Sequence, residues 1–286
     1  TEDTLIGNLP FYKSVRFLKD YVVEDKFPLV LLRGLTLEDM KLFVQNIEMA
    51  LQEEQIIREI CEQTDELLRA EVITPETVEA VFHSRHVKTY TFEQVYFPSG
   101  TLIAADPICE LQSMYVPVIK ETIPSGYYPI TIGILDSELV GIRMTGMRLK
   151  VTEEEALSYQ AATMYKAKDK KEFRAAFPVD AGMFTFCDKE AAESYWKVLY
   201  VWYKEHPNGN WYNDYLADLF KESAEAYPDL QREGGDFIRF KIPESNNEIV
   251  MVATGFGDGI YQVFWGVDKN GKRCELVTLF VDPRKA

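Results

Sequence analysis

The chain has 286 residues, of which 47% are hydrophobic and 13% aromatic, so it can build about two folded domains and is not a disordered chain. Its formal net charge of −15 repels phosphate backbones, which argues against a nucleic-acid partner. No apolar run approaches the roughly 18 residues of a transmembrane helix, so we expect no membrane partner either.

Residues 1–89 are predicted to be mostly helical. Apolar side chains recur at helical spacing from residue 35 in LTLEDMKLFVQNIEMALQEEQIIREICEQTDELLRAE and again in ITPETVEAVFHSRH. Thr36 and Thr74 are expected N-caps, and Pro75 suits the first helical position. The two helices would form a hairpin whose apolar face packs on the rest of the chain or on a second copy, so a homo-oligomer is one expectation. The apolar run at 27–35 fits either a strand or a helical turn.

From about residue 90 the pattern changes to short segments that are rich in β-branched and aromatic residues and end at Gly, Pro, Asp or Asn. Two helical stretches, 188–206 and 212–227, interrupt them. Because strands and helices do not alternate regularly, we expect an α+β domain at 90–286 around a mainly antiparallel sheet, with the helical region as an N-terminal appendage. The eight expected strands lie in GTLIAADP, YYPITIGILD, LVGIRMTGMRLKV, GMFTFCD, DFIRFKI, NEIVMVATG, IYQVFWGVD and RCELVTLFVD.

The chain lacks a recognisable catalytic or metal-ligand motif. Three histidines and four widely spaced cysteines form neither a nucleophile signature nor a zinc pattern, so we expect no bound metal and no cofactor. His83 and His86 could share one helix face and bind a metal ion, but a solvated helix end is the favoured interpretation. Reduced cysteines in a cytoplasmic protein are the simpler interpretation.

Acidic residues, among them Asp180 and Asp258, fall at the ends of expected strands. Loop carboxylates could bind a hard cation such as calcium or magnesium, yet aspartate is also a preferred turn residue. In GFGDG, residues 255–259, the following strand favours a tight β connection over a phosphate loop. We therefore expect Asp258 to accept hydrogen bonds within its own loop and at least one of Gly257 and Gly259 to have a positive φ.

Five ordered segments resemble a known bacterial family, the one catalogued as domain of unknown function 4241. The resemblance covers about residues 90–286 and implies a bacterial, cytoplasmic domain, without an activity that could be transferred. Gln262 departs from the pattern, since proline is expected there in relatives. The segments are PSGTLIAADP, YYPITIGILD, FPVDAGMFTFCD, QREGGDF and GFGDGIYQVFWGVDKNG.

Our first functional hypothesis is a non-enzymatic domain that binds a ligand or docks on another protein, in an immunity-like or regulatory role. Eight Tyr and Trp residues between 195 and 215 fit a protein interface, although the same stripe also fits the core face of a helix. The alternative is a carboxylate-based hydrolase that could use a divalent cation. The candidate ligand-binding residues are Asp180, Arg232, Glu233, Asp258 and Trp265.

Overall fold

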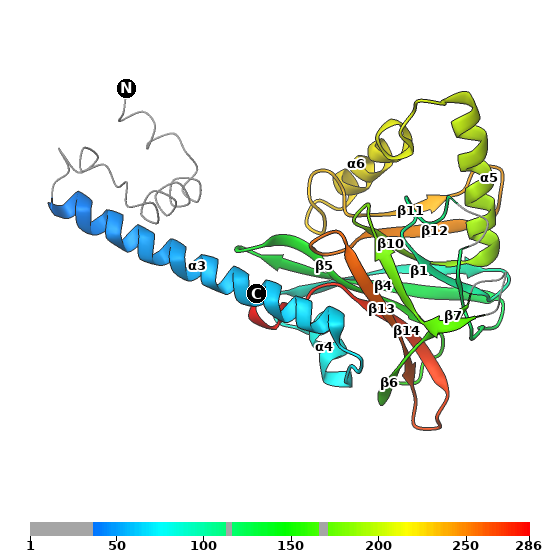
Figure 1. Cartoon of the computed structure of the whole chain (residues 1–286), viewed down its shortest axis with the longest axis horizontal. Helices are drawn as coiled ribbons and strands as arrows, with labels where there is room; N and C mark the ends of the chain where they lie inside the picture. The colour runs from blue at the N-terminus through cyan, green and yellow to red at the C-terminus, as the bar shows by residue number, and fades with distance from the viewer. Residues whose placement is uncertain (1–36, 113–115, 166–170) are drawn as a thin grey trace. The chain divides into compact units, whose positions relative to one another are not determined.

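The structure, a computed structural model, describes residues 37–112, 116–165 and 171–286 (Figure 1). The chain forms two compact units, residues 1–59 and 60–286. The apolar run at 27–35 and the Thr36 cap lie outside the described residues. The division at residue 89 that the sequence suggests stays a prediction about independent folding.

Two N-terminal helices form where the sequence predicts them. Helix α3 (Leu37–Arg69) begins in the first unit and ends in the second, and α4 (Pro75–His83) lies within the second. Thr74 caps α4 through its hydroxyl, which accepts a hydrogen bond from the Thr77 backbone N–H, and Pro75 opens the helix. The helix ends at His83, so His86 lies in the following turn and the expected shared helix face does not exist.

The second unit is built on a seven-stranded antiparallel sheet. Its strands run in the order β1, β4, β5, β14, β13, β6, with β9 also paired to β13. The bounds are β1 (Val87–Phe97), β4 (Gly126–Ser137), β5 (Gly141–Lys150), β6 (Ser158–Ala161), β9 (Ala176–Val179), β13 (Gly259–Val267) and β14 (Arg273–Leu279).

A second, four-stranded antiparallel sheet runs in the order β11, β12, β10, β2, and a small sheet is formed by β3, β7 and β8. The antiparallel pairings confirm the α+β class predicted from the sequence. These strands are β2 (Leu102–Ala105), β3 (Val118–Ile119), β7 (Thr163–Tyr165), β8 (Glu172–Arg174), β10 (Met183–Asp188), β11 (Phe237–Lys241) and β12 (Glu248–Ala253).

The two large sheets pack face to face, and helices cover their outer faces. Phe184 of β10 and Phe280, just after β14, meet edge to face between the sheets, with ring centroids 5.6 Å apart. The helices α5 (Lys189–Glu205) and α6 (Ala217–Ala226) lie on the four-stranded sheet (Figure 1). Helix α4 packs on the seven-stranded sheet, where Val81 and Phe82 join a buried cluster with Val277. Strands β2, β10 and β12 are buried along their whole length, which explains why their sequences are almost continuously apolar.

The aromatic stretch 195–215 divides between the core and the surface of the second unit. Trp211 is 1% exposed and donates a hydrogen bond from Nε1 to the Tyr195 hydroxyl at 2.8 Å, so these two rings belong to the core. Tyr200 is 50% exposed and stacks on Trp196 at the surface. A π-helical turn, Tyr212–Leu216, leads into α6, where the sequence predicts one continuous helix.

Candidate functional site

A cavity of about 290 Å³ opens where three loops of the second unit meet the start of strand β5. The loops are the connection before β10, the connection before β11 and the turn between β12 and β13. Four of its twelve lining residues are glycines, which bring polypeptide backbone to the cavity wall. The lining residues are Arg143, Ala181, Gly182, Met183, Tyr212, Arg232, Gly235, Ala253, Thr254, Gly255, Phe256 and Gly257.

The turn between β12 and β13 forms one side of the cavity. The Gly257 N–H donates to the Thr254 carbonyl at 2.6 Å, which closes a four-residue turn. Gly255 has φ +47° and Gly257 has φ +108°, so the expected positive φ is confirmed at Gly257. A Cβ at Gly255 would lie 2.4 Å from Cγ2 of Val281, which leaves room only for glycine.

Asp258 does not close this loop, contrary to the sequence-based expectation. The Thr254 hydroxyl and the Tyr261 hydroxyl both donate to the Gly257 carbonyl, at 2.8 and 2.6 Å. The Asp258 side chain is exposed, and its carboxylate accepts none of the hydrogen bonds found within the described ranges. The buried Thr254 and Tyr261 hydroxyls take the role in this loop that the sequence assigned to the Asp258 carboxylate.

A second side of the cavity is fixed by a fully buried carboxylate, Asp106. Its Oδ2 accepts hydrogen bonds from the backbone N–H groups of Asp180 at 3.1 Å and Ala181 at 2.8 Å. Its Oδ1 accepts from the N–H groups of Ile108 and Cys109. One side chain from a distant segment thereby holds the loop that carries Asp180 in place.

Arg232 forms the third side and is held rigidly. Its Nε donates to Oδ1 of Asp236 at 2.9 Å, and its backbone N–H donates to Oδ2 at 2.7 Å. Asp236 is 1% exposed, and Gln231 supports this turn by accepting from the Asp236 and Phe237 N–H groups. The hydrogen bond to Asp236 raises the pKa of Arg232 from its ordinary value.

Arg143 of β5 completes the site, and its guanidinium is only partly satisfied. Nη1 donates to the Ile142 carbonyl at 2.9 Å, and the group lies 5.8 Å from the ring centroid of Phe256. Its Nε is buried and has no hydrogen-bond partner, and no ion pair to Arg143 is formed by the residues that the structure describes. Burial, followed by repulsion from Arg232, lowers the pKa of Arg143.

The structure places one of the five candidate residues that the sequence suggested in the wall of the cavity. Arg232 lines the cavity, while Asp180 and Asp258 adjoin the lining residues Ala181 and Gly257. Glu233 follows Arg232 in the chain and is exposed.

Trp265 lies elsewhere. It is 2% exposed, and its Nε1 donates to Oε2 of Glu121 at 3.1 Å, so it does not share a cavity with Arg232. Sequence reasoning missed Arg143 and Phe256. An arginine within an alternating strand normally faces solvent, and so nothing in the local pattern marks Arg143.

The chemistry of this cleft is that of anion binding. Two guanidinium groups lie near each other, and only one of them has a carboxylate partner. The nearby acids do not gather as metal ligands: within the described residues, no group of three or more His, Cys, Asp or Glu side chains is placed to hold a metal ion. No described helix is both long and apolar enough to cross a membrane.

Fold and site together define an α+β domain of packed antiparallel sheets with a glycine-lined cleft that holds two arginines. The chain belongs to the family described as Protein of unknown function (DUF4241), whose model matches residues 95–278. No curated protein and no solved structure matches the chain. Three of the five segments that carry the family resemblance, at 177–188, 231–237 and 255–271, supply lining residues of the cleft.

Proposed function

We propose that this domain is a non-enzymatic ligand-binding domain whose glycine-lined cleft takes a small anion, a carboxylate or a phosphate. The observation that carries the proposal is the buried, unpartnered Nε of Arg143. A buried donor without an acceptor costs free energy, and an anion in the adjacent cavity would supply both the acceptor and the missing negative charge.

Arg232 supports the same ligand chemistry. Asp236 occupies the Nε and one Nη of Arg232, which fixes the orientation of the guanidinium and leaves its other nitrogen available for donation. Repulsion between Arg143 and Arg232 contributes to the lowered pKa of Arg143, so an anion near both groups would relieve that repulsion.

The size of the cavity limits the ligand. About 290 Å³ is at the lower end of the range for small-molecule pockets, so the ligand is a small metabolite rather than a nucleotide or a peptide. Phe256, which is 42% exposed, would cover an apolar portion of it.

In this proposal the domain performs no chemistry on the anion. The domain has a regulatory role in the cytoplasm, as the sequence led us to expect. Binding of the anion changes the surface by which the domain contacts another protein. A second copy bound through α3 is one such partner, since Leu42 and Met49 are exposed seven residues apart on that helix. The hydrolase alternative gains no support from Asp180, Glu233 or Asp258, because all three side chains are exposed.

Thermal melting in the presence of anions tests the proposal. We expect phosphate, acetate, succinate or citrate at about 10 mM to raise the melting temperature by a few degrees, since a ligand that binds only the folded state stabilises it. Arg143→Met should abolish the rise. It should still fold, because the change removes an unpaired buried donor.

Lys150→Met is the matched control, since it removes one positive charge from the same strand outside the cleft. It should keep the response of the parent protein. A screen in which no anion raises the melting temperature, with ionic strength held constant by chloride, would refute the proposal. An equal rise in Arg143→Met would place the anion elsewhere and refute it as well.

A further inference from the structure

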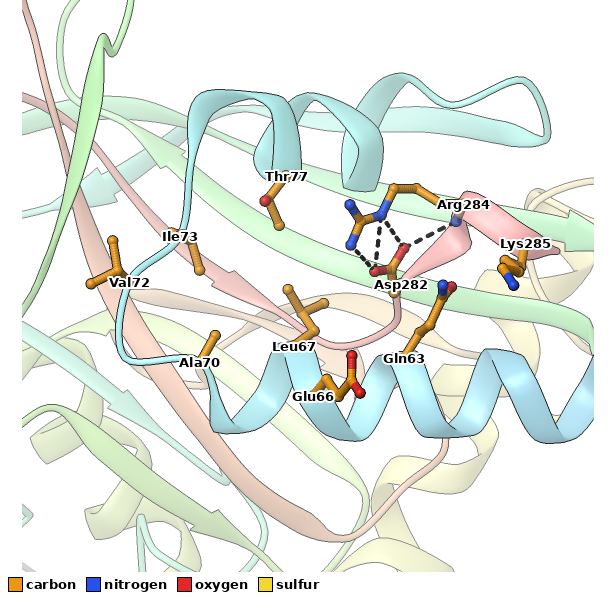
Figure 2. A pocket seen from close by; sticks show the side chains of 10 residues that line it. All are labelled: Gln63, Glu66, Leu67, Ala70, Val72, Ile73, Thr77, Asp282, Arg284 and Lys285. Carbon is orange, nitrogen blue, oxygen red and sulfur yellow. Dashed lines mark hydrogen bonds and ion pairs between the residues drawn. The ribbon is translucent and has the colours of Figure 1, made fainter.

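A second cavity, of about 380 Å³, is lined by residues within 63–77 and within 282–285, near the C-terminal end (Figure 2). The last turns of α3, the connection to α4, the first turn of α4 and the segment after β14 surround it. All of these residues belong to the second compact unit. The lining residues are Gln63, Glu66, Leu67, Ala70, Val72, Ile73, Thr77, Asp282, Arg284 and Lys285.

One end of this cavity is apolar. Leu67 and Ile73 belong to the buried cluster beneath α4, with Ala70 packed against it. Val72 is 73% exposed, an unusual position for a β-branched side chain at the border of a cavity. Figure 2 shows Val72 and Ile73 at one end of the cavity and Arg284 and Lys285 at the other. An aliphatic group could therefore lie on Val72 and Ile73 without contacting the charged residues.

The polar end offers hydrogen-bond acceptors from α3. The Gln63 side chain extends from the helix toward the segment that carries Asp282 (Figure 2), and its Oε1 is buried without a hydrogen-bond partner. Glu66, one turn further along, also lines the cavity, and no hydrogen bond or ion pair is formed by its carboxylate within the described residues. A buried acceptor beside an uncompensated carboxylate suits a ligand ammonium group, which has three N–H donors.

The polar end also offers a donor across from α3. Asp282 is 2% exposed and is neutralised by Arg284, whose Nε lies 2.9 and 3.0 Å from its two oxygens. The Arg284 side chain is 53% exposed, and its other Nη is not used in this pair. The hydrogen bond to Asp282 raises the pKa of Arg284 from its ordinary value, so the guanidinium remains charged. It can donate to a ligand carboxylate while keeping Asp282 paired.

We propose that this cavity binds a free α-amino acid with an aliphatic side chain. Its ammonium group would donate to Gln63 Oε1 and Glu66, its carboxylate would accept from Arg284, and its side chain would cover Val72 and Ile73. A ligand with only a positive charge would make no hydrogen bond to Arg284, and a ligand with only a negative charge would be repelled by Glu66. Only a zwitterion satisfies both sets of groups at once.

Calorimetric titration of the full chain tests this assignment with three compounds of the same carbon skeleton. L-leucine carries both charges, 3-methylbutylamine only the ammonium and 4-methylpentanoate only the carboxylate. We expect leucine to bind at least about tenfold more tightly than either single-charge compound, because each charge-assisted hydrogen bond is worth about a factor of ten or more.

Glu66→Gln is the informative variant, because Glu66 is exposed and the substitution leaves the fold intact. Leucine affinity should fall about tenfold in Glu66→Gln and stay unchanged in Glu62→Gln, a charge-matched control on the same helix that does not line the cavity. Gln63→Leu should also weaken leucine. Arg143→Met, in the other cavity, should bind leucine normally.

Three results would overturn the assignment. The first is the absence of binding by leucine, isoleucine, valine and methionine up to about 10 mM. The second is equal affinity for leucine and 3-methylbutylamine, which would indicate a site for cations alone. The third is unchanged leucine affinity in Glu66→Gln.

Discussion

Gly255 is a residue of the cleft that depends on the absence of a side chain. Gly255→Ala would place a Cβ 2.4 Å from Val281 Cγ2 in a backbone with φ +47°. We expect about 1–2 kcal/mol of destabilisation from the left-handed backbone and a further 1–3 kcal/mol, roughly, from overpacking. Urea denaturation measures the sum.

Gly271→Ala separates the two contributions to that loss. Gly271 has φ +74°, and a Cβ there meets no atom within 4 Å, so only the backbone cost of about 1–2 kcal/mol remains. Equal losses of unfolding free energy in the two variants would show that contact with Val281 is not what excludes a side chain at Gly255.

The reactivity of the Cys109 thiol depends on the acidic residues beside the cleft. Partial burial, together with the negative charges of Asp106, Asp180, Glu110 and Asp258, raises the pKa of the Cys109 thiol to about 11, well above its ordinary value. A raised pKa keeps the thiol protonated, and only the thiolate reacts. Alkylation at about pH 8 should therefore be roughly a hundredfold slower than for an ordinary thiol, and should accelerate with pH until about 11.

Mass spectrometry of iodoacetamide-treated protein measures this rate for the Cys109 peptide. Asp258→Asn should speed the reaction, because removing a nearby negative charge lowers the pKa of the thiol. Asp218→Asn, on α6, should have no effect. A Cys109 that reacts at about pH 8 like an ordinary thiol would contradict the prediction.

At the scale of an element, the end of α3 is held by side chains from far along the chain. Gln262 Nε2 donates to the carbonyls of Leu68 and Ala70 at 2.7 and 2.9 Å. Arg174 Nη2 donates to the carbonyl of Glu71 at 2.6 Å. These bonds satisfy backbone groups that a helix end leaves unpaired. They also explain the glutamine at position 262, where the family resemblance leads us to expect proline. A proline side chain has no donor and could not cap α3.

Gln262→Leu should therefore loosen the end of α3 specifically. We expect a loss of about 1–2 kcal/mol, about 1 kcal/mol for each hydrogen bond, and faster amide exchange at residues 66–72. Gln160→Leu on the neighbouring strand β6 is the control, since its side chain is exposed. Hydrogen exchange followed by mass spectrometry distinguishes the two, and unchanged exchange at 66–72 in Gln262→Leu would show that the caps contribute nothing.

At the scale of the whole molecule, the position of the domain boundary can be tested by truncation. Val78, Val81 and Phe82 of α4 are buried, and the Thr145 hydroxyl of β5 donates to the Val81 carbonyl at 2.6 Å. We expect a fragment of residues 60–286 to unfold cooperatively. A fragment of residues 90–286 should be several kcal/mol less stable, since losing one buried Phe alone costs about 3–5 kcal/mol.

Thermal melts of the two fragments, with fluorescence of a dye that binds exposed apolar surface, decide between the boundaries. If residues 90–286 melt cooperatively at the temperature of the longer fragment, the division at residue 89 inferred from composition is the correct one. Dye binding by the shorter fragment alone would support a boundary before α4.

Local chemistry in the sequence determined most of the elements. Asp188 and Thr74 mark the starts of α5 and α4, because a short polar side chain there accepts a hydrogen bond from the first turn. The eight strands predicted from β-branched runs and turn residues all occur. The positive φ at Gly257 follows from the same turn chemistry. These signals act over a few residues, so the sequence alone carries them.

Only the tertiary structure decided how those elements pair into sheets and which residues meet in the cleft. Strand β1 and the short strands β3, β6 and β9 pair with segments that are distant in the sequence, so no local pattern marked them. The same holds for the cleft. Arg143 looks like a solvent-facing strand residue until β5 meets the loops that carry Arg232 and Phe256. The physical reason is that the burial of a side chain, and whether its donors find acceptors, depends on segments that folding brings together.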